Sequence, residues 1–194
     1  ILLDGLRERG VHATFFLIGS KIDGQEELVR RMQAEGHQIG NHSYDHAMLQ
    51  KTDTASALRD LARCDAALQQ LLGEGTYWVR PPYGLISQAE LSAIHTPLLH
   101  WSVDTRDWDL RDADKVLDII LREADDGDVI LLHDCYAASV EAALLVPVLM
   151  LLLALLLQPS FLLYTRAVMQ QAASEGLRVL ATREQGGVAT QEAC

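Results

Sequence analysis

A chain of 194 residues is long enough to bury a substantial hydrophobic core as one ordinary domain. Its composition, 49% hydrophobic and 22% charged, is that of a globular protein and excludes a wholly disordered chain. The formal net charge of −11 argues against a nucleic-acid partner, because proteins of that class usually carry a basic surface stripe.

Three cysteines, Cys64, Cys135 and Cys194, are too few and too scattered for a disulfide framework or a cysteine-rich zinc site. Their odd number leaves at least one free thiol, so they do not fix the redox compartment. The chain begins at Ile1 without a charged-then-apolar leader. This start is typical of a fragment or a processed chain, and it leaves export open.

Alternating helices and strands are predicted from Ile1 to Leu132. Helices are indicated by apolar side chains three or four residues apart, and strands by short apolar, β-prone runs. In chain order they are a helix at Ile1–Arg9, a strand at Ala13–Ile18, a helix at Asp23–Ala34, a strand at Gln38–Gly40, a helix at Asp53–Leu72, a strand at Tyr77–Arg80, a short helix after Ser87, a strand at Leu98–Val103, a helix at Ala113–Ala124 and a strand at Asp128–Leu132. This alternation favours a parallel sheet or barrel of βα units.

Two pairs of residues resemble capping boxes at helix starts, namely Asp23 with Glu26 and Ser87 with Glu90. In βα folds the reactive residues lie at the C-terminal ends of the strands. The polar residues at or just beyond the predicted ends are His42, Arg80, Asp104, Asp107 and His133.

The stretch Ala142–Leu157 is continuously apolar and contains Pro147. A membrane-spanning helix needs about 20 apolar residues, so this shorter, proline-containing run favours a buried helix over a membrane contact. The tail then returns to an ordinary pattern, with a helix predicted through Met169–Glu175 and a last strand at Leu177–Ala181.

His42 and His46 stand four residues apart, just after a strand that Gly40 closes. On one helical turn both rings would lean to the same side and reach a single metal ion. Two histidines at this spacing are also compatible with surface or capping roles. The flanking Asn41 and Asp45 are candidates to orient the rings, although Asp45 is better explained by solvent exposure or by capping a turn.

Arg80-Pro81-Pro82-Tyr83-Gly84 is a rigid segment directly after a predicted strand. Two prolines fix the backbone and Gly84 permits a sharp turn. Such rigidity could hold the Tyr83 backbone N–H toward a developing oxyanion, and the alternative is a purely structural turn.

Two further segments carry candidate reactive groups. A buried Arg80 needs a carboxylate partner, and Asp107 is the natural candidate. Trp108 offers a flat wall for a sugar ring, with core packing as the alternative. His133 ends the most apolar strand and suits a general acid whose pKa is tuned by a neighbouring carboxylate, or else a capping residue.

Together and in this order, these segments resemble the polysaccharide deacetylase family, the NodB-homology domain of carbohydrate esterase family 4. The matching segments are Ala13–Phe16, Gly40–His46 with the H-S/T-x-x-H motif, Arg80–Gly84, Asp104–Trp108 and Leu131–Asp134. The resemblance covers roughly Ile1–Tyr136 and, more loosely, Thr165–Gln185. It implies an α/β fold, a distorted (β/α) barrel, and metal-dependent removal of acetyl groups from a carbohydrate.

The resemblance also implies roles for single residues. His42 and His46 would bind a divalent metal, zinc or alternatively cobalt, that activates water. The Tyr83 backbone N–H would help to stabilise the oxyanion, and His133 would protonate the departing amine or alcohol.

The remaining implied roles concern the walls of the site. Arg80, held by Asp107, would tune the catalytic base. Trp108 and Leu132 would shape the substrate groove and the pocket for the acetyl methyl group.

The chain departs from the family pattern at its start. The family's first motif, T-F-D-D-G-P, supplies the catalytic base and the third metal ligand, and it belongs upstream of the helix that begins at Ile1. Asp4 does not replace these aspartates, because it lies inside that helix without the surrounding motif. We therefore expect this chain to lack the first barrel strand, to bind metal weakly and to be nearly inactive.

The second departure is the apolar stretch 142–164, which we interpret as an atypical insertion in a single domain covering 1–194. It could be an extra helix, a membrane-facing element or a fault in the gene model.

The leading hypothesis is a metal-dependent deacetylase acting on a polysaccharide or oligosaccharide such as peptidoglycan, chitin oligomers or acetylated xylan. By the same resemblance the protein is expected to be secreted or in the cell envelope. The alternatives are a carbohydrate-binding relic without the catalytic aspartates and a membrane-associated accessory protein, which would rest on 142–164 alone.

Overall fold

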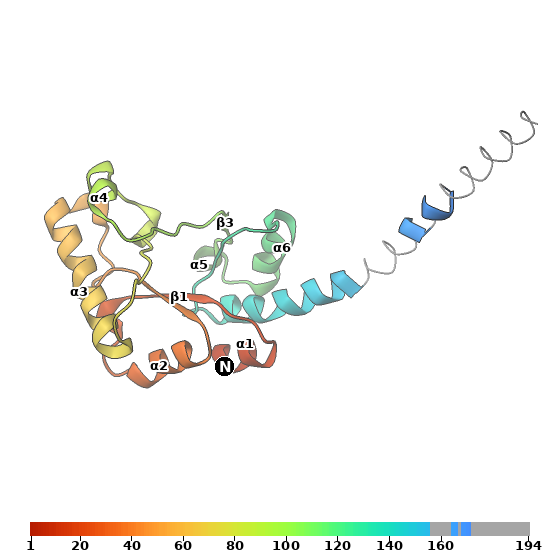
Figure 1. Cartoon of the computed structure of the whole chain (residues 1–194), viewed down its shortest axis with the longest axis horizontal. Coiled ribbons are helices and arrows are strands. Elements are labelled where there is room, and N and C mark those ends of the chain that lie inside the picture. Colours follow the sequence, from red (N-terminus) through yellow and green to blue (C-terminus); the bar gives the residue numbers. More distant parts are fainter. Residues whose placement is uncertain (156–163, 167, 172–194) are drawn as a thin grey trace, which may run out of the picture. The chain divides into compact units, whose positions relative to one another are not determined.

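The computed structural model describes residues 1–155, 164–166 and 168–171 (Figure 1). The chain divides into two units, Ile1–Pro147 and Val148–Cys194. The predicted insertion begins in the first unit and continues into the second, and its assignment as an insertion in a single domain stays a prediction. The predicted strand Leu177–Ala181 and the end of the predicted helix Met169–Glu175 lie outside the described residues, whereas residues 168–171 are helical.

Helices and strands alternate along the first unit as predicted (Figure 1). In chain order they are α1 (Leu2–Glu8), β1 (Thr14–Leu17), α2 (Glu26–Ala34), β2 (Gln38–Asn41), α3 (Thr54–Leu72), α4 (Gln88–Ala93), β3 (Val103–Asp104), α5 (Asp107–Leu110), α6 (Ala113–Glu123) and β4 (Ile130–Leu131). Short 3-10 turns lie at η1 (Gly19–Lys21), η2 (Leu49–Lys51) and η3 (Pro82–Gly84). A further helix, Ala137–Leu155, follows β4 and is called the apolar helix below.

All strand pairs in the described residues are parallel. β1 pairs with β2, and isolated bridges from Asn41 to Val79 and from Val79 to Leu98 extend this order. β3 pairs separately with β4, with Val103 opposite Ile130. The predicted strand Tyr77–Arg80 is reduced to a bridge because Pro81 and Pro82 follow it, and proline has no N–H to donate to a ladder.

One of the two predicted capping boxes is confirmed, and a cap that we did not predict stands at the start of α3. Asp53 accepts a 2.9 Å hydrogen bond from the Ser56 N–H at the start of α3. Ser87 and Glu90 form a capping box at the start of α4. The box predicted for Asp23 and Glu26 is wrong, because α2 begins after Gln25 and the Glu26 carboxylate instead accepts a hydrogen bond from the Gly24 N–H.

The main core lies between β1 and β2 on one side and α1, α2 and α3 on the other. Its buried residues are Leu3, Leu6, Phe15, Ile22, Met32, Ile39, Cys64, Leu68 and Tyr77. A separate cluster joins α6 to the first turns of the apolar helix through Val116, Ile120 and Ala142. The beginning of the apolar helix is therefore part of the first unit.

The prediction that the apolar stretch is a buried helix is wrong for most of its described part. Ala142 is fully buried, but the large side chains from Val148 onward, apart from Leu149, are exposed, with Leu151 61% accessible and Leu155 55%. The helix Ala137–Leu155 is long and apolar enough to cross a membrane, and only 11% of its most apolar window is buried.

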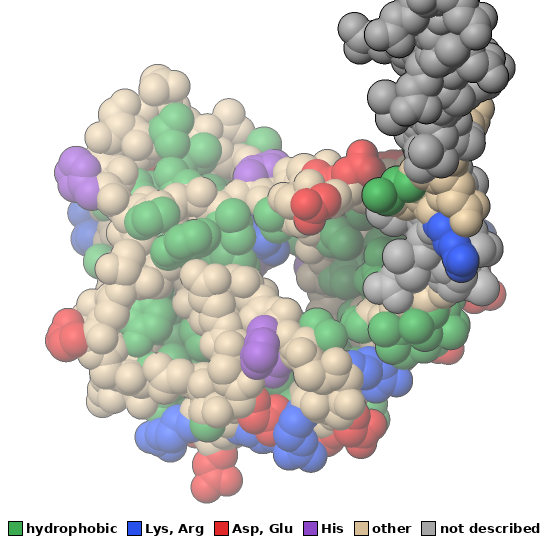
Figure 2. All heavy atoms as spheres, turned by 45° about the vertical axis from the view of Figure 1, so that its right-hand side comes forward, with side chains coloured by type: hydrophobic (Ala, Val, Ile, Leu, Met, Phe, Trp, Pro, Cys, Tyr) green, Lys and Arg blue, Asp and Glu red, His purple; other side chains and the backbone are tan. Residues whose placement is uncertain are grey.

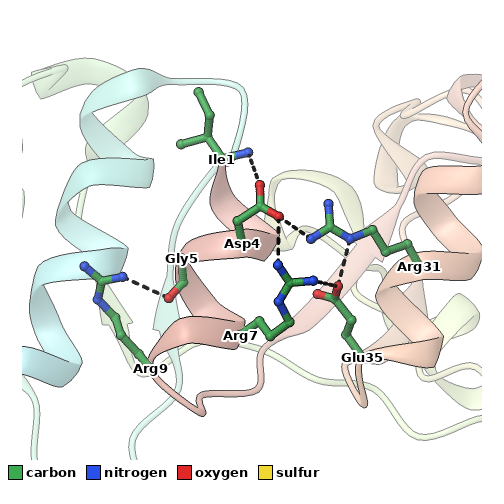
Figure 3. Close-up of polar contacts among 7 residues, drawn as sticks. All are labelled: Ile1, Asp4, Gly5, Arg7, Arg9, Arg31 and Glu35. Atoms are coloured by element: carbon green, nitrogen blue, oxygen red, sulfur yellow. Dashed lines mark hydrogen bonds and ion pairs between the residues drawn. The ribbon is translucent and has the colours of Figure 1, made fainter.

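An ion-pair network joins α1 to α2 (Figure 3). Arg31 lies 2.5 Å from the Asp4 carboxylate and 2.8 Å from that of Glu35, and Arg7 contacts both acids. The hydrogen bond from Arg31 lowers the pKa of Asp4 to about 2. Asp4 thus joins α1 to α2 through its ion pair with Arg31.

Charged side chains are mixed on the surface. On the face drawn in Figure 2, Lys and Arg side chains lie between Asp and Glu side chains and do not gather into a stripe. This distribution is typical of a solvated surface.

Gly40 provides a test of the packing that positions the residues after β2. A Cβ atom there would lie 2.5 Å from the Phe16 ring and 2.9 Å from the Trp78 carbonyl oxygen. We expect Gly40→Ala to lower the free energy of unfolding by about 1–3 kcal/mol, since overpacking forces these neighbours apart. Urea unfolding measures the loss. Gly75→Ala is the matched control, because the nearest atoms to its Cβ lie at 3.8 Å. Equal stability of the two variants would contradict the proposed close approach.

Candidate active site

The predicted site residues follow the C-terminal ends of neighbouring parallel strands. His42 comes directly after β2, Arg80 after the bridge at Val79, and His133 two residues after β4. Asp107 opens α5, three residues after β3. The two pairs of strands belong to separate sheets, but the contacts of His42 with Arg80 and of His133 with Asp107, and the electrostatic effect of His133 on His42, show that these four residues lie near one another.

The segment from His42 to His46 is an irregular loop, so the predicted helical turn is wrong. Ser43 and His46 have positive φ angles of 65° and 56°, a backbone conformation that is uncommon for residues other than glycine. The buried Asn41 fixes the loop, because its side-chain oxygen accepts a 2.8 Å hydrogen bond from the Ser43 N–H and its amide donates to the Leu61 carbonyl. Asn41 therefore orients the loop backbone.

The rings of His42 and His46 lie next to each other. Their centroids are 4.8 Å apart. His42 Nδ1 lies 2.7 Å from the Arg80 carbonyl oxygen, which can only accept, so Nδ1 carries the proton and Nε2 is free to bind a metal. Burial lowers the pKa of His42 to about 4 and also lowers the pKa of His46. Both imidazoles are therefore neutral at pH 7, which is the form that binds metal.

The side chain of Arg80 packs against β1. Its guanidinium carbon is 4.2 Å from the centroid of the Phe16 ring, and burial lowers its pKa. Its Nε is buried without a hydrogen-bond partner in the described part of the chain. The predicted ion pair between Arg80 and Asp107 is wrong, because both oxygens of Asp107 are used by other donors.

Asp107 is fully buried and accepts three hydrogen bonds. The His133 backbone N–H lies 2.6 Å from Oδ2, and His133 Nδ1 lies 2.8 Å from Oδ1. The Ser139 hydroxyl also donates to Oδ2. Burial alone would raise the pKa of Asp107, but the bonds from His133 and Ser139 outweigh it and lower that pKa. The carboxylate is therefore ionised at neutral pH.

This carboxylate tunes His133. The hydrogen bond to Asp107 raises the pKa of His133 although burial opposes the shift. The ring is half-buried, with 38% of the side chain accessible, so it can still reach a substrate. Asp107 is therefore the neighbouring carboxylate that the sequence interpretation of His133 requires, and the role of His133 as a general acid stays a prediction.

The three imidazoles share one site. The charge of His133 contributes to lowering the pKa of both His42 and His46, and Arg80 contributes to lowering the pKa of His133. Across residues 1–155, 164–166 and 168–171, no group of three or more His, Cys, Asp or Glu side chains is arranged to hold a metal. The described residues thus provide the histidine pair His42 and His46 and, separately, the hydrogen-bonded pair Asp107 and His133.

The three predicted substrate-binding residues differ in how exposed they are and in what they contact. Tyr83 has a positive φ of 59°, and its exposed ring lies 5.0 Å from that of His46. Trp108 is 49% accessible on α5, which removes core packing as its explanation. Leu132 is partly buried against the cluster of α6 and the apolar helix.

Ser139 was not identified from the sequence. It is 1% accessible and lies in the first turn of the apolar helix. The available signal was its distance of six residues from His133, which places a hydroxyl in the helix that follows the strand end. Nothing else in the sequence indicates that this serine, which follows two alanines in a helix, donates to a buried carboxylate.

The polysaccharide deacetylase family model matches residues 2–96. The peptidoglycan deacetylase PdaC of Bacillus subtilis, a solved structure, superposes with a TM-score of 0.72 and 34% identity over 75% of this chain and 72% of that chain. The chain belongs to the polysaccharide deacetylase family. Its fold is accordingly the distorted (β/α) barrel of the NodB-homology type that we predicted.

Two curated members of the polysaccharide deacetylase family show how much of a relative this chain represents. The peptidoglycan-N-acetylglucosamine deacetylase PgdA of Listeria monocytogenes is 38% identical over 146 residues, which is 74% of this chain and 31% of that protein. The chitooligosaccharide deacetylase of a Bradyrhizobium species is 34% identical over 72% of this chain and 66% of its own length. The chain therefore spans about a third of the first curated relatives. A second family model, for TadE-like proteins, matches residues 137–178.

The Asp107–His133 pair predicts a specific pH dependence. A raised pKa in the folded state stabilises the fold below the unfolded histidine pKa of about 6.5, and this contribution is lost as pH rises through the folded value. We expect a histidine NMR titration to place His133 above 6.5. In Asp107→Asn burial remains without the carboxylate, so the His133 pKa should fall below 6.5 while that of His42 stays near 4. An unchanged His133 titration in that variant would contradict the pairing.

Ser139→Ala tests the third donor to Asp107. Its removal leaves a buried acceptor with one donor fewer, which we expect to cost about 1–3 kcal/mol of unfolding free energy in urea. Ser92→Ala is the matched control on another helix, because the Ser92 hydroxyl donates to a backbone carbonyl at the surface. Unfolding of both variants at the same urea concentration would contradict the hydrogen bond from Ser139 to Asp107.

Proposed function

We propose that this chain is the catalytic module of a metal-dependent deacetylase that removes acetyl groups from an N-acetylglucosamine polymer. The observation that carries the proposal is the Asp107–His133 dyad beside two neutral imidazoles at one barrel edge. An ionised carboxylate behind a half-exposed histidine is an arrangement suited to a general acid.

His42 and His46 are the residues that would hold the metal. They fit this role because the His42 proton is fixed on Nδ1 by the Arg80 carbonyl, and because burial keeps both rings neutral. The chemistry that zinc or cobalt supplies when bound there is Lewis-acid activation of water and of the acetyl carbonyl.

The chain's own residues would complete the reaction. His133 donates its Nε2 proton to the leaving nitrogen, since Nδ1 is engaged by Asp107. Asp107 holds the ring in orientation and stabilises its protonated form. The Tyr83 backbone N–H, fixed in a left-handed conformation between Pro82 and Gly84, is the candidate oxyanion donor.

The walls of the site provide the substrate contacts. The exposed indole of Trp108 is free to stack on a sugar ring, and Leu132 borders the space for the acetyl methyl group. Arg80 would act on the catalytic base, since its buried Nε has no partner among the described residues and a carboxylate is the natural acceptor for it.

The substrate class follows from the relatives. Their names specify peptidoglycan N-acetylglucosamine and chitooligosaccharide, both of which carry N-acetyl groups. We therefore propose N-deacetylation of a cell-wall or chitin-type glycan and a location in the cell envelope.

A carbohydrate-binding relic is the second candidate. It is favoured by the lack of a third metal ligand in the described part of the chain. The two candidates differ in whether an in-frame Asp-Asp-Gly-Pro motif precedes Ile1 in the gene. Acetate release from a panel of acetylated glycans, measured with zinc on a chain that includes the upstream residues, tests the enzyme directly. No release from any glycan would favour the relic.

Metal binding gives a prediction for the chain as it stands. Zinc titration should show weak binding through two histidines, and His42→Ala should weaken it at least tenfold because one of two ligands is lost. His100→Ala is the control, since that ring stacks on Trp101. His133→Ala should leave zinc affinity unchanged and abolish any acetate release. Micromolar zinc affinity with full deacetylation by this chain alone would contradict the expected need for two further aspartates.

A further inference from the structure

The apolar helix changes its surroundings along its length. In its first turns Ser139 and Ala142 are buried in the first unit, and Leu144 packs against Gly5 of α1. From Val148 onward its large side chains are exposed, except for the half-buried Leu149. They are Val148, Met150, Leu151, Leu152, Leu153 and Leu155.

These exposed side chains surround the helix. Successive residues of an α-helix are rotated by about 100°, so Leu151, Leu152 and Leu153 point in three different directions. A helix that packs on a protein partner shows one apolar stripe and an opposite polar face. A helix that is apolar on all sides needs an apolar environment on all sides, and a lipid bilayer provides it.

The sequence around the helix has the length that a bilayer requires. No Asp, Glu, Lys or Arg lies between Glu141 and Arg166. A spanning helix needs about 20 predominantly apolar residues, and this uncharged segment is at least as long. Pro147 is compatible with this environment, because prolines are tolerated in membrane helices.

We propose that the apolar helix inserts into the hydrocarbon core of a lipid bilayer and anchors the deacetylase module to it. The net charge of −11 disfavours electrostatic attraction of the chain to anionic lipids, so the apolar side chains are the proposed source of binding. The helix that enters the membrane is the same helix whose Ser139 binds Asp107, so the anchor begins within the catalytic module. This last consequence rests on the proposed function, whereas the insertion itself does not.

Flotation with vesicles of neutral phosphatidylcholine tests the insertion. The full chain is purified in mild detergent and the detergent is removed in the presence of vesicles. We expect the chain to float with the lipid and to stay bound in high salt. The variant Leu151→Glu/Leu152→Glu/Leu153→Glu should float at least tenfold less, because charged side chains are costly inside a bilayer.

A matched variant separates insertion from general surface hydrophobicity. Leu28, Leu91 and Leu121 are similarly exposed, at 41–43%, on α2, α4 and α6. Their triple replacement by Glu should leave flotation unchanged. The fluorescence of Trp78, Trp101 and Trp108, all in the first unit, reports whether each variant is folded.

Depth is measured with Leu152→Trp in vesicles that contain brominated lipids. Quenching that is strongest for bromines near the acyl-chain ends supports insertion. Three results would each overturn the proposal. They are equal flotation of the wild type and the helix variant, release of the chain from the vesicles by salt, and discrete oligomers that remain in the lipid-free fraction. The last result would identify a second copy of the chain as the partner of the helix. Acetate release is not read in these experiments, so their failure would leave the proposed function standing.

Discussion

The buried carboxylate of Asp107 is the constraint on which the candidate site depends. A fully buried charge is costly unless it is hydrogen-bonded, and Asp107 meets this requirement with donors from His133 and Ser139. The same bonds fix the ring of His133 and raise its pKa. Stability and chemistry are therefore linked here, because any change that leaves this carboxylate without donors also releases the proposed general acid.

The loops around the site are held in uncommon backbone conformations. Ser43, His46, Tyr83 and Arg106 all have positive φ angles, and each lies beside or within a candidate functional segment. Such conformations persist only when the surrounding structure imposes them. Here the imposing contacts come from the buried Asn41 under the histidine loop and from the two prolines before Tyr83.

The apolar helix lies in the region that the TadE-like family model matches, and its first turns also pack into the unit that contains the deacetylase match. The TadE-like match begins at residue 137, yet Ser139 and Ala142 are buried among residues of the first unit. The helix therefore cannot be removed at the boundary of the match without exposing Asp107 and the α6 cluster. A lipid anchor that begins inside the module would hold the proposed enzyme near a membrane surface.

The sequence by itself determined the alternation of helices and strands, the parallel strands, the capping box of Ser87 and Glu90 and the set of strand-end residues, because these follow from local periodicity and from motifs that lie close together in the chain. Only the tertiary structure decided the partner of Asp107, the irregular loop between His42 and His46, and the exposure of the helix after Pro147. These features depend on which groups from distant segments meet. The packing of β4 and α5 decides that His133, and not Arg80, is the partner of the buried Asp107 carboxylate. Burial of an apolar run likewise depends on whether another segment of the chain covers it.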